Sequence, residues 1–318
     1  MKIALLLFIS LNYSCIKKDK NTHETDFDSV FNTIKTKSIQ EVDWLSIYNK
    51  TKDSIRVFNS IDDKYRAITY TLDQLEDRHS FFAYPKNKQV FSKLDTTDIP
   101  EVCHYIFDQN IAYLKIEGFG GDKNLNDEYV LSIRKALYDL DRQKEVSGWI
   151  IDLRDNFGGK LGGFSIGLAP LYKDSILGFS MNNKKEFIQH KLKNNTYQYG
   201  NTKLVNPLIN SKDTLSNKNK PIAILVNQNT ASQAESITIH LIRQQNTRVF
   251  GTKTNGLTTD IEVFNFASGA MFGFSTAYWY DPNKNRIKGP VIPDVDTEED
   301  DSKDVAIEWI KHTTHLIK

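Results

Sequence analysis

Ser232 lies where an apolar strand pattern gives way to a helical one, and a serine hydroxyl at such a junction can act as a nucleophile. Residues 222–226 form an apolar run of strand length, residues 227–230 have turn chemistry, and residues 231–245 have the composition of a helix. Free N–H groups and the positive end of the helix dipole meet at a helix start, where they can stabilise an oxyanion. Serine is also a preferred N-cap residue, so the position alone leaves a structural role open.

His79 is the candidate base for such a serine. It lies in the segment 77–80, which follows a stretch with helical spacing. An exposed imidazole titrates near neutral pH, so it can take the proton of a serine hydroxyl without a shifted pKa, and activity should then fade through the usual histidine range. Taken alone, a histidine in this place is more often structural or simply exposed.

Two adjacent glycines, Gly158 and Gly159, follow a strand pattern and the charged residues Asp152, Arg154 and Asp155. Adjacent glycines allow a backbone conformation in which N–H groups point at an anion. An ordinary tight turn would explain the pair equally well. It is not a phosphate loop, because it lacks both the Gly-Lys-Ser/Thr ending and the GxGxxG pattern.

Strand and helix patterns alternate around these residues. Residues 111–119 and 148–153 read as strands, residues 129–140 as a helix, and residues 271–280 as an aromatic-rich strand. This alternation predicts an α/β core domain, expected over residues 100–318. The last helix is predicted around residues 304–312.

The chain before this core divides into three predicted parts. Lys2 and the apolar residues 3–11 are typical of a signal peptide, which ends at Cys15; the apolar run is too short to span a bilayer. Cleavage before Cys15 and lipidation of its thiol predict a bacterial lipoprotein with a signal peptide over residues 1–15. Asn12 and Tyr13 fit a lipidation signal poorly, so secretion with a free thiol is the alternative.

A polar tether follows the predicted anchor and leads into a small helical module. The tether covers residues 16–25, and residues 26–84 carry apolar residues at helical spacing. Only Cys103 remains in the body of the chain, so no intramolecular disulfide is expected there.

The composition argues against several classes of partner. The 318 residues have a formal net charge of +1 and no broad basic face, so nucleic acid is not an expected partner. The seven histidines show no HExxH or comparable ligand spacing, so neither a metal site nor a cofactor is expected.

Taken together, the motifs resemble one family, the tail-specific (C-terminal processing) and tricorn-core serine peptidases, whose domain also occurs in the retinoid-binding protein of the eye. The similar segments, in the family's order, are DRHSFF, GWIIDLRDNFGG, NTASQAES, FGTKTNG and VIPDV. The resemblance implies an α/β fold with a crotonase/Clp-like ββα core behind a small N-terminal helical module. About thirty residues separate Ser80 from Ile111, too few for the family's peptide-binding PDZ domain, so recognition of substrate C-termini by such a domain is not implied.

The resemblance also indicates which residue would act as the general base. Bacterial processing members use a lysine shortly after Gly-x-x-Thr-x-Gly, but Gly256 is followed here by Leu257 and two threonines. The tricorn branch uses a histidine from the element that DRHSFF resembles, which carries the role to His79. Lys253, inside the motif, is the alternative base and would need a strongly lowered pKa.

With His79 as base, Ser232 would attack a peptide carbonyl. Backbone N–H groups of Gln233 and of Gly158 or Gly159 would then hold the oxyanion. The group that orients His79 is less defined, because Arg78 stands where the tricorn branch has a serine. Asp77, Glu235 and Glu262 are candidates by residue type alone, and Glu235 also fits a capping box at the helix start.

These patterns predict a serine-type endopeptidase, lipid-anchored in the bacterial cell envelope at the periplasmic or outer surface, that cleaves exported polypeptides. The alternative is a lipid-anchored binding protein that keeps the fold but has lost efficient catalysis. A binding protein requires neither Ser232 nor His79, so the presence of both favours the enzyme.

Overall fold

A computed structural model describes residues 26–55, 60–84, 98–143, 145–172, 176–209, 215–216, 219–244 and 246–317. The predicted signal peptide, the tether and the lipidation residue Cys15 lie outside these ranges. No helix in the described part is both long and apolar enough to cross a membrane.

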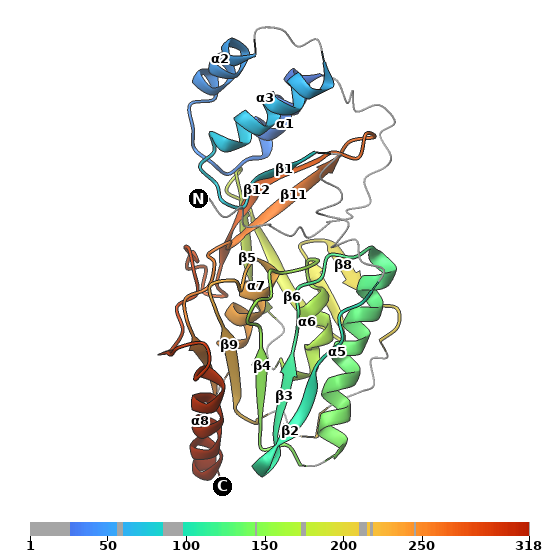
Figure 1. The fold of residues 1–318 in the computed structure, drawn as a ribbon, viewed down its shortest axis with the longest axis vertical. Coiled ribbons are helices and arrows are strands. Elements are labelled where there is room, and N and C mark those ends of the chain that lie inside the picture. Colours follow the sequence, from blue (N-terminus) through green and yellow to red (C-terminus); the bar gives the residue numbers. More distant parts are fainter. Residues whose placement is uncertain are drawn as a thin grey trace.

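Three helices form the predicted N-terminal module, at the top of Figure 1: α1 (Phe27–Lys37), α2 (Trp44–Ser54) and α3 (Ile61–Asp73). Each begins after a residue whose side chain accepts a hydrogen bond from an N–H of the first turn, which satisfies a backbone donor left free at a helix start. Their apolar faces pack on Phe272 and Phe274 of the core. The module is therefore part of one continuous hydrophobic packing with the domain below it.

The core is built on a mainly parallel sheet of six strands among the described residues. In spatial order these are β13 (Val295–Asp296), β10 (Thr247–Gly251), β9 (Ile222–Val226), β4 (Gly148–Asp152), β3 (Ile111–Lys115) and β2 (His104–Phe107). Only β2 runs antiparallel to its neighbour. This arrangement confirms the predicted α/β class.

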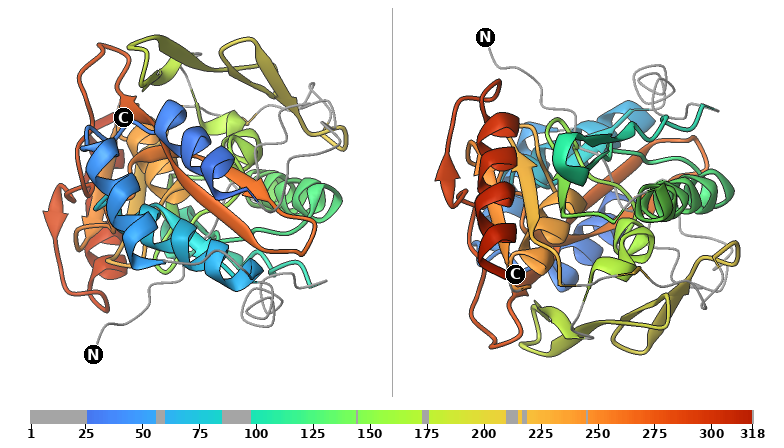
Figure 2. Two further views of the ribbon diagram at one scale, coloured as in Figure 1. Left: turned by 90° about the horizontal axis from the view of Figure 1, so that it is seen from above. Right: turned by 90° about the horizontal axis from the view of Figure 1, so that it is seen from below.

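Helices cover both faces of this sheet, as its continuous apolar strands require. Helix α5 (Lys123–Gln143) packs on one face and α8 (Ser302–Ile317) on the other, as the view from below in Figure 2 shows. In β3, Leu114 packs with the α5 side and Tyr113 with the α8 side. Both helices are longer than the sequence predicts.

A second sheet, seven-stranded over the described ranges, is antiparallel and centred on β12 (Met271–Tyr280). Its other strands are β1 (Phe81–Ala83), β5 (Ile176–Asn182), β6 (Phe187–Lys193), β7 (Thr196–Tyr199), β8 (Thr202–Val205) and β11 (Thr259–Asn265). Strands β11 and β12 run beneath the helical module (Figure 1). The strands β5 to β8 are a feature that the sequence analysis did not predict.

Two junctions in this fold position the candidate site. Strand β1 begins two residues after His79 and pairs with β12, so the end of the helical segment is held on the second sheet. Helix α7 (Gln233–Leu241) follows β9 and is shorter than the predicted 231–245, because it begins only after Ser232 and already ends at Leu241. Among the short elements are α6 (Gly163–Gly167), η2 (Asp108–Asn110) and η3 (Ala169–Leu171).

Candidate active site

Ser232 occupies a strained turn at the start of α7. Its backbone has φ 53° and ψ −117°, outside the helical region, and its residue is 5% exposed. A non-glycine residue with positive φ costs of order 1–3 kcal/mol, so the surrounding contacts must hold it. Ala231 N–H donates to the Asn156 carbonyl at 2.9 Å, and the Thr230 hydroxyl donates to the Leu153 carbonyl at 2.8 Å. These bonds fix the turn to the loop that leaves β4.

The glycine loop lies directly against this turn. Gly158 has φ 111°, and a Cβ atom placed on it would lie 3.0 Å from the Cβ of Ser232 and 3.1 Å from the Gln233 nitrogen. Only glycine tolerates both the conformation and this approach. The predicted proximity of the glycine pair to the serine is therefore present in the structure.

The two glycine N–H groups differ in what they can bind. The Gly158 N–H donates to the buried Asn156 side chain at 2.8 Å, so the structure argues against Gly158 as an oxyanion donor. Among the described residues, no acceptor faces the N–H of Gly159 or of Gln233. These two groups remain as the candidate oxyanion donors.

Replacing Gly158 by alanine should reduce kcat/KM on the order of 10²-fold or more, because the new methyl would displace the Ser232 turn and the adjacent Gln233 N–H. The measurement is steady-state cleavage by the purified variant. Gly163→Ala is the matched control, since its added Cβ would meet only Val130 at an ordinary 3.4 Å. Equal activity of the two variants would contradict the assigned geometry.

The charged residues ahead of the glycines hold the loop. The buried carboxylate of Asp152 pairs with Arg154 and accepts a hydrogen bond from the Tyr113 hydroxyl at 2.6 Å. Arg154 also donates to the Glu299 carbonyl at 2.8 Å, ahead of α8. Asp155 accepts from the side chains of Asn227 and Asn229 in the turn that precedes Ser232. These charges are engaged within the protein.

His79 is buried, at 2% exposure, and its ring is held by hydroxyl groups. Its Nδ1 lies 2.8 Å from Thr259 Oγ1, which in turn lies 2.7 Å from Ser275 Oγ. Its Nε2 is buried and has no hydrogen-bond partner among the described residues. Thr259 is thus the group that orients the ring, and the sequence analysis missed it. The only signal was its position three residues after Gly256.

None of the three acidic candidates contacts the imidazole. Asp77 accepts from the His79 backbone N–H at 3.0 Å and from the Ser80 hydroxyl at 2.7 Å, so it shapes the turn. Glu262 pairs with Lys37 at 2.5 Å. Glu235 accepts hydrogen bonds from backbone N–H groups, including that of Ser232 at 2.9 Å, in agreement with the predicted capping role. The Thr259 hydroxyl therefore contacts His79 Nδ1, where a carboxylate was expected.

Burial lowers the pKa of His79 to about 4, and the charges of Asp77 and Asp260 oppose this shift only in part. The expectation of a base with an unshifted pKa was therefore wrong, because it assumed an unburied ring. The lowered pKa keeps the imidazole neutral, and able to accept a proton, well below pH 6.5.

One loop, residues 254–259, contacts both halves of the site. The Leu257 N–H donates to Glu235 at 2.8 Å, and Thr259, two residues later, contacts His79. Arg78, next to His79, donates to the side chain of Asn255 at 3.0 Å. This loop thus links the segments that carry Ser232 and His79, and no hydrogen bond joins these two side chains in the described structure. Lys253, the alternative base, is exposed at the start of this loop.

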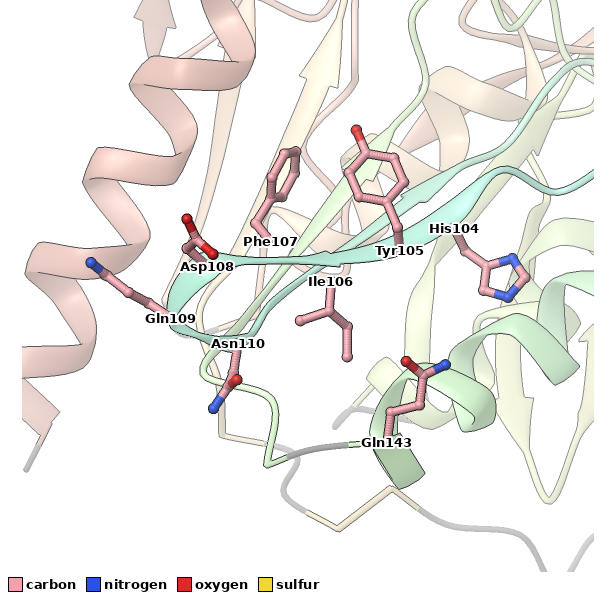
Figure 3. Close-up of a pocket in the computed structure, with 8 residues that line it drawn as sticks. All are labelled: His104, Tyr105, Ile106, Phe107, Asp108, Gln109, Asn110 and Gln143. Atoms are coloured by element: carbon pink, nitrogen blue, oxygen red, sulfur yellow. The ribbon is translucent and has the colours of Figure 1, made fainter.

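A separate pocket of about 440 Å³ lies at the outer edge of the six-stranded sheet, and Figure 3 shows it. It is lined by residues 104–110 and Gln143, with the side chains of Tyr105 and Phe107 directed away from that of Ile106. None of the lining residues belongs to the turns that carry Ser232 or His79. Within the described ranges, no three His, Cys, Asp or Glu side chains are grouped to hold a metal ion.

Comparison with known proteins gives matches in sequence and in fold. Residues 110–297 match the profile of Peptidase family S41. The nisin-resistance protein of Lactococcus lactis subsp. lactis is 28% identical over 205 residues, and the match covers 64% of this chain and 60% of that relative. The chain thus spans less than two thirds of that relative's length.

Two solved structures share the fold. A lipoprotein from Streptococcus agalactiae superposes with a TM-score of 0.77 at 21% identity, covering 94% of this chain and 99% of the other. The photosystem II D1 C-terminal processing protease superposes with a TM-score of 0.58 at 14% identity, covering 88% and 94%.

Proposed function

Because the chain belongs to peptidase family S41, we propose that it is a serine-type endopeptidase with Ser232 as nucleophile and His79 as general base. The observation that carries this proposal is the pairing of a strained serine at a helix start with a buried histidine. The ring of that histidine is held at Nδ1 and leaves Nε2 without a partner among the described residues. A neutral imidazole that donates from Nδ1 keeps a lone pair at Nε2, which can accept a proton.

Acylation follows from this arrangement. With Nδ1 protonated and donating to Thr259, Nε2 carries the lone pair that accepts the hydroxyl proton of Ser232. Ser232 Oγ then adds to the peptide carbonyl, and the N–H groups of Gln233 and Gly159 hold the oxyanion; one such donor is typically worth about 2.7–4 kcal/mol. The imidazolium gives its proton to the leaving amine as the C–N bond breaks.

Deacylation uses the same groups in reverse. His79 takes a proton from water, the hydroxide adds to the acyl carbon, and the Ser232 oxygen leaves with the proton returned by the histidine. Thr259 accepts from Nδ1 throughout and passes a hydrogen bond to Ser275. The charges of Asp77 and Asp260 favour the imidazolium that forms in each step.

We assign the enzyme to the bacterial cell envelope, held by a lipid on Cys15, where it would meet exported polypeptides. The signal-like sequence supports this assignment, and so does the likeness of fold to a lipoprotein. The name of the relative from Lactococcus lactis makes nisin the first defined substrate to test.

The test is cleavage of casein and of nisin by the protein beginning after Cys15, over about pH 4 to 9. We expect cleavage, with the acid limb of kcat/KM falling below pH 6.5, because burial lowers the pKa of His79 to about 4 and this limb reports the free enzyme. A limb at pH 6.5 would contradict the buried base. No cleavage of either substrate by the folded protein would favour the binding-protein alternative.

Loss of activity through acid unfolding must be distinguished from the acid limb of kcat/KM. Burial lowers the pKa of His79, His190 and His240, the last to about 3. The unfolded chain gains protons near pH 6.5, whereas the folded chain gains them only at lower pH, so stability falls as the pH drops below 6.5. Circular dichroism at each pH defines the range in which the protein is folded and the rates can be interpreted.

A further inference from the structure

Glu235 is a fully buried carboxylate that accepts four hydrogen bonds next to Ser232. One oxygen accepts from the Thr254 hydroxyl at 2.5 Å and the Gly256 N–H at 2.7 Å. The other accepts from the Ser232 N–H at 2.9 Å and the Leu257 N–H at 2.8 Å. A capping role explains only the bond to Ser232.

The four hydrogen-bond donors around Glu235 favour its ionised form. Three of them are backbone N–H groups, which can only donate, and both oxygens already accept two bonds. Burial raises the pKa of Glu235, but the four hydrogen bonds oppose that shift and match an ionised carboxylate. Its place in the first turn of α7 adds the favourable end of the helix dipole.

These bonds join two segments that carry different halves of the chemistry. Ser232 is on the α7 side, and the 254–257 segment is on the other side. That segment holds Asn255, whose side chain accepts from Arg78 beside His79, and it leads directly to Thr259, which holds the imidazole. The separation of Ser232 and His79 therefore depends on how this segment is docked.

We propose that Glu235 is a positioning residue whose ionised carboxylate fixes the strained Ser232 turn in register with the loop that orients His79. This inference rests on the proposed function, since it assigns a role only if Ser232 and His79 react together. It predicts that a neutral isostere weakens the chemical step while substrate binding is retained.

Glu235→Gln tests the proposal, because a carboxamide has one acceptor oxygen and turns its NH₂ group toward two of the four donors. We expect kcat on casein to fall about 10²-fold or more with KM changed less than about threefold, since a displacement near 1 Å can cost that much. Labelling of Ser232 by a fluorophosphonate, a small reagent that needs no peptide site, should slow in parallel.

Two further variants keep the test decisive. Glu262→Gln, on the neighbouring strand, removes only the charge that pairs with Lys37 and should keep wild-type rates. Thr254→Val deletes one bond to the carboxylate and also the acceptor of the Val291 N–H. It should lower kcat by a smaller factor, and it replaces Glu235→Gln if that variant fails to fold.

Wild-type kcat in Glu235→Gln, or a loss seen in KM instead, would overturn the positioning role while leaving the peptidase intact. If Thr254→Val is used in place of Glu235→Gln, an unchanged kcat would also overturn the positioning role. Absence of both cleavage and labelling in the wild type would instead overturn the proposed function, and the positioning role with it.

Discussion

Replacing Ser232 by alanine is expected to lower kcat/KM on casein by about 10⁴-fold to 10⁶-fold, the range found when a serine nucleophile is removed. The physical reason is that the acyl-enzyme has no other oxygen to form on, whereas the oxyanion donors and the substrate contacts remain. The fold should persist, because alanine can take the same backbone position and the turn is held by backbone bonds such as that from Ala231 to Asn156.

Ser236→Ala is the matched control for this substitution. Ser236 lies on the same helix, is 5% exposed like Ser232, and has no part in the proposed chemistry. Its variant should cleave at the wild-type rate. Substantial cleavage by Ser232→Ala, with loss in Ser236→Ala, would place the nucleophile one turn further along α7.

Replacing His79 by alanine should cause a loss of comparable size, about 10⁴-fold or more in kcat, because a serine hydroxyl is a poor nucleophile without a positioned base. The double variant with Ser232→Ala should lose little more than either single variant, since residues that act as a unit are strongly non-additive. Steady-state kinetics of the three variants measure this coupling.

Lys253→Ala distinguishes the two possible bases. The lysine is exposed and lies outside the segments that hold His79, so its removal should leave kcat within about twofold of wild type. Full activity in His79→Ala together with loss in Lys253→Ala would assign the lysine instead.

The nucleophile turn was predictable because its signals are local. An apolar strand, a polar turn and a helix follow one another within residues 222–241, so the position of Ser232 at the helix start depends little on the rest of the chain. The α/β class was predictable for the same reason, since alternating patterns imply parallel strands joined by helices.

The partner of His79 was not predictable, because it comes from far along the chain. Thr259 lies 180 residues away in sequence and reaches the ring only because β1 and β11 both pair with β12. A threonine also carries no charge that would mark it as an orienting group. The burial that lowers the pKa of His79 arises from the same tertiary packing.

The sequence predicted which backbone N–H groups could bind the oxyanion, but a side chain already occupies one of them. Gly158 lies against Ser232, yet its N–H donates to the Asn156 side chain. A sequence pattern shows which N–H groups have the freedom to face a ligand, and only the folded loop shows which of them are already bonded.

Ser232 is expected to be a nucleophile that is activated within this fold. The most direct test is to label the folded protein beginning after Cys15 with a fluorophosphonate, digest it and locate the adduct by mass spectrometry, with His79→Ala beside the wild type. We expect one adduct on Ser232 in the wild type and a strongly reduced labelling rate in His79→Ala. An adduct at another residue, or none on a protein that cleaves casein, would contradict this expectation.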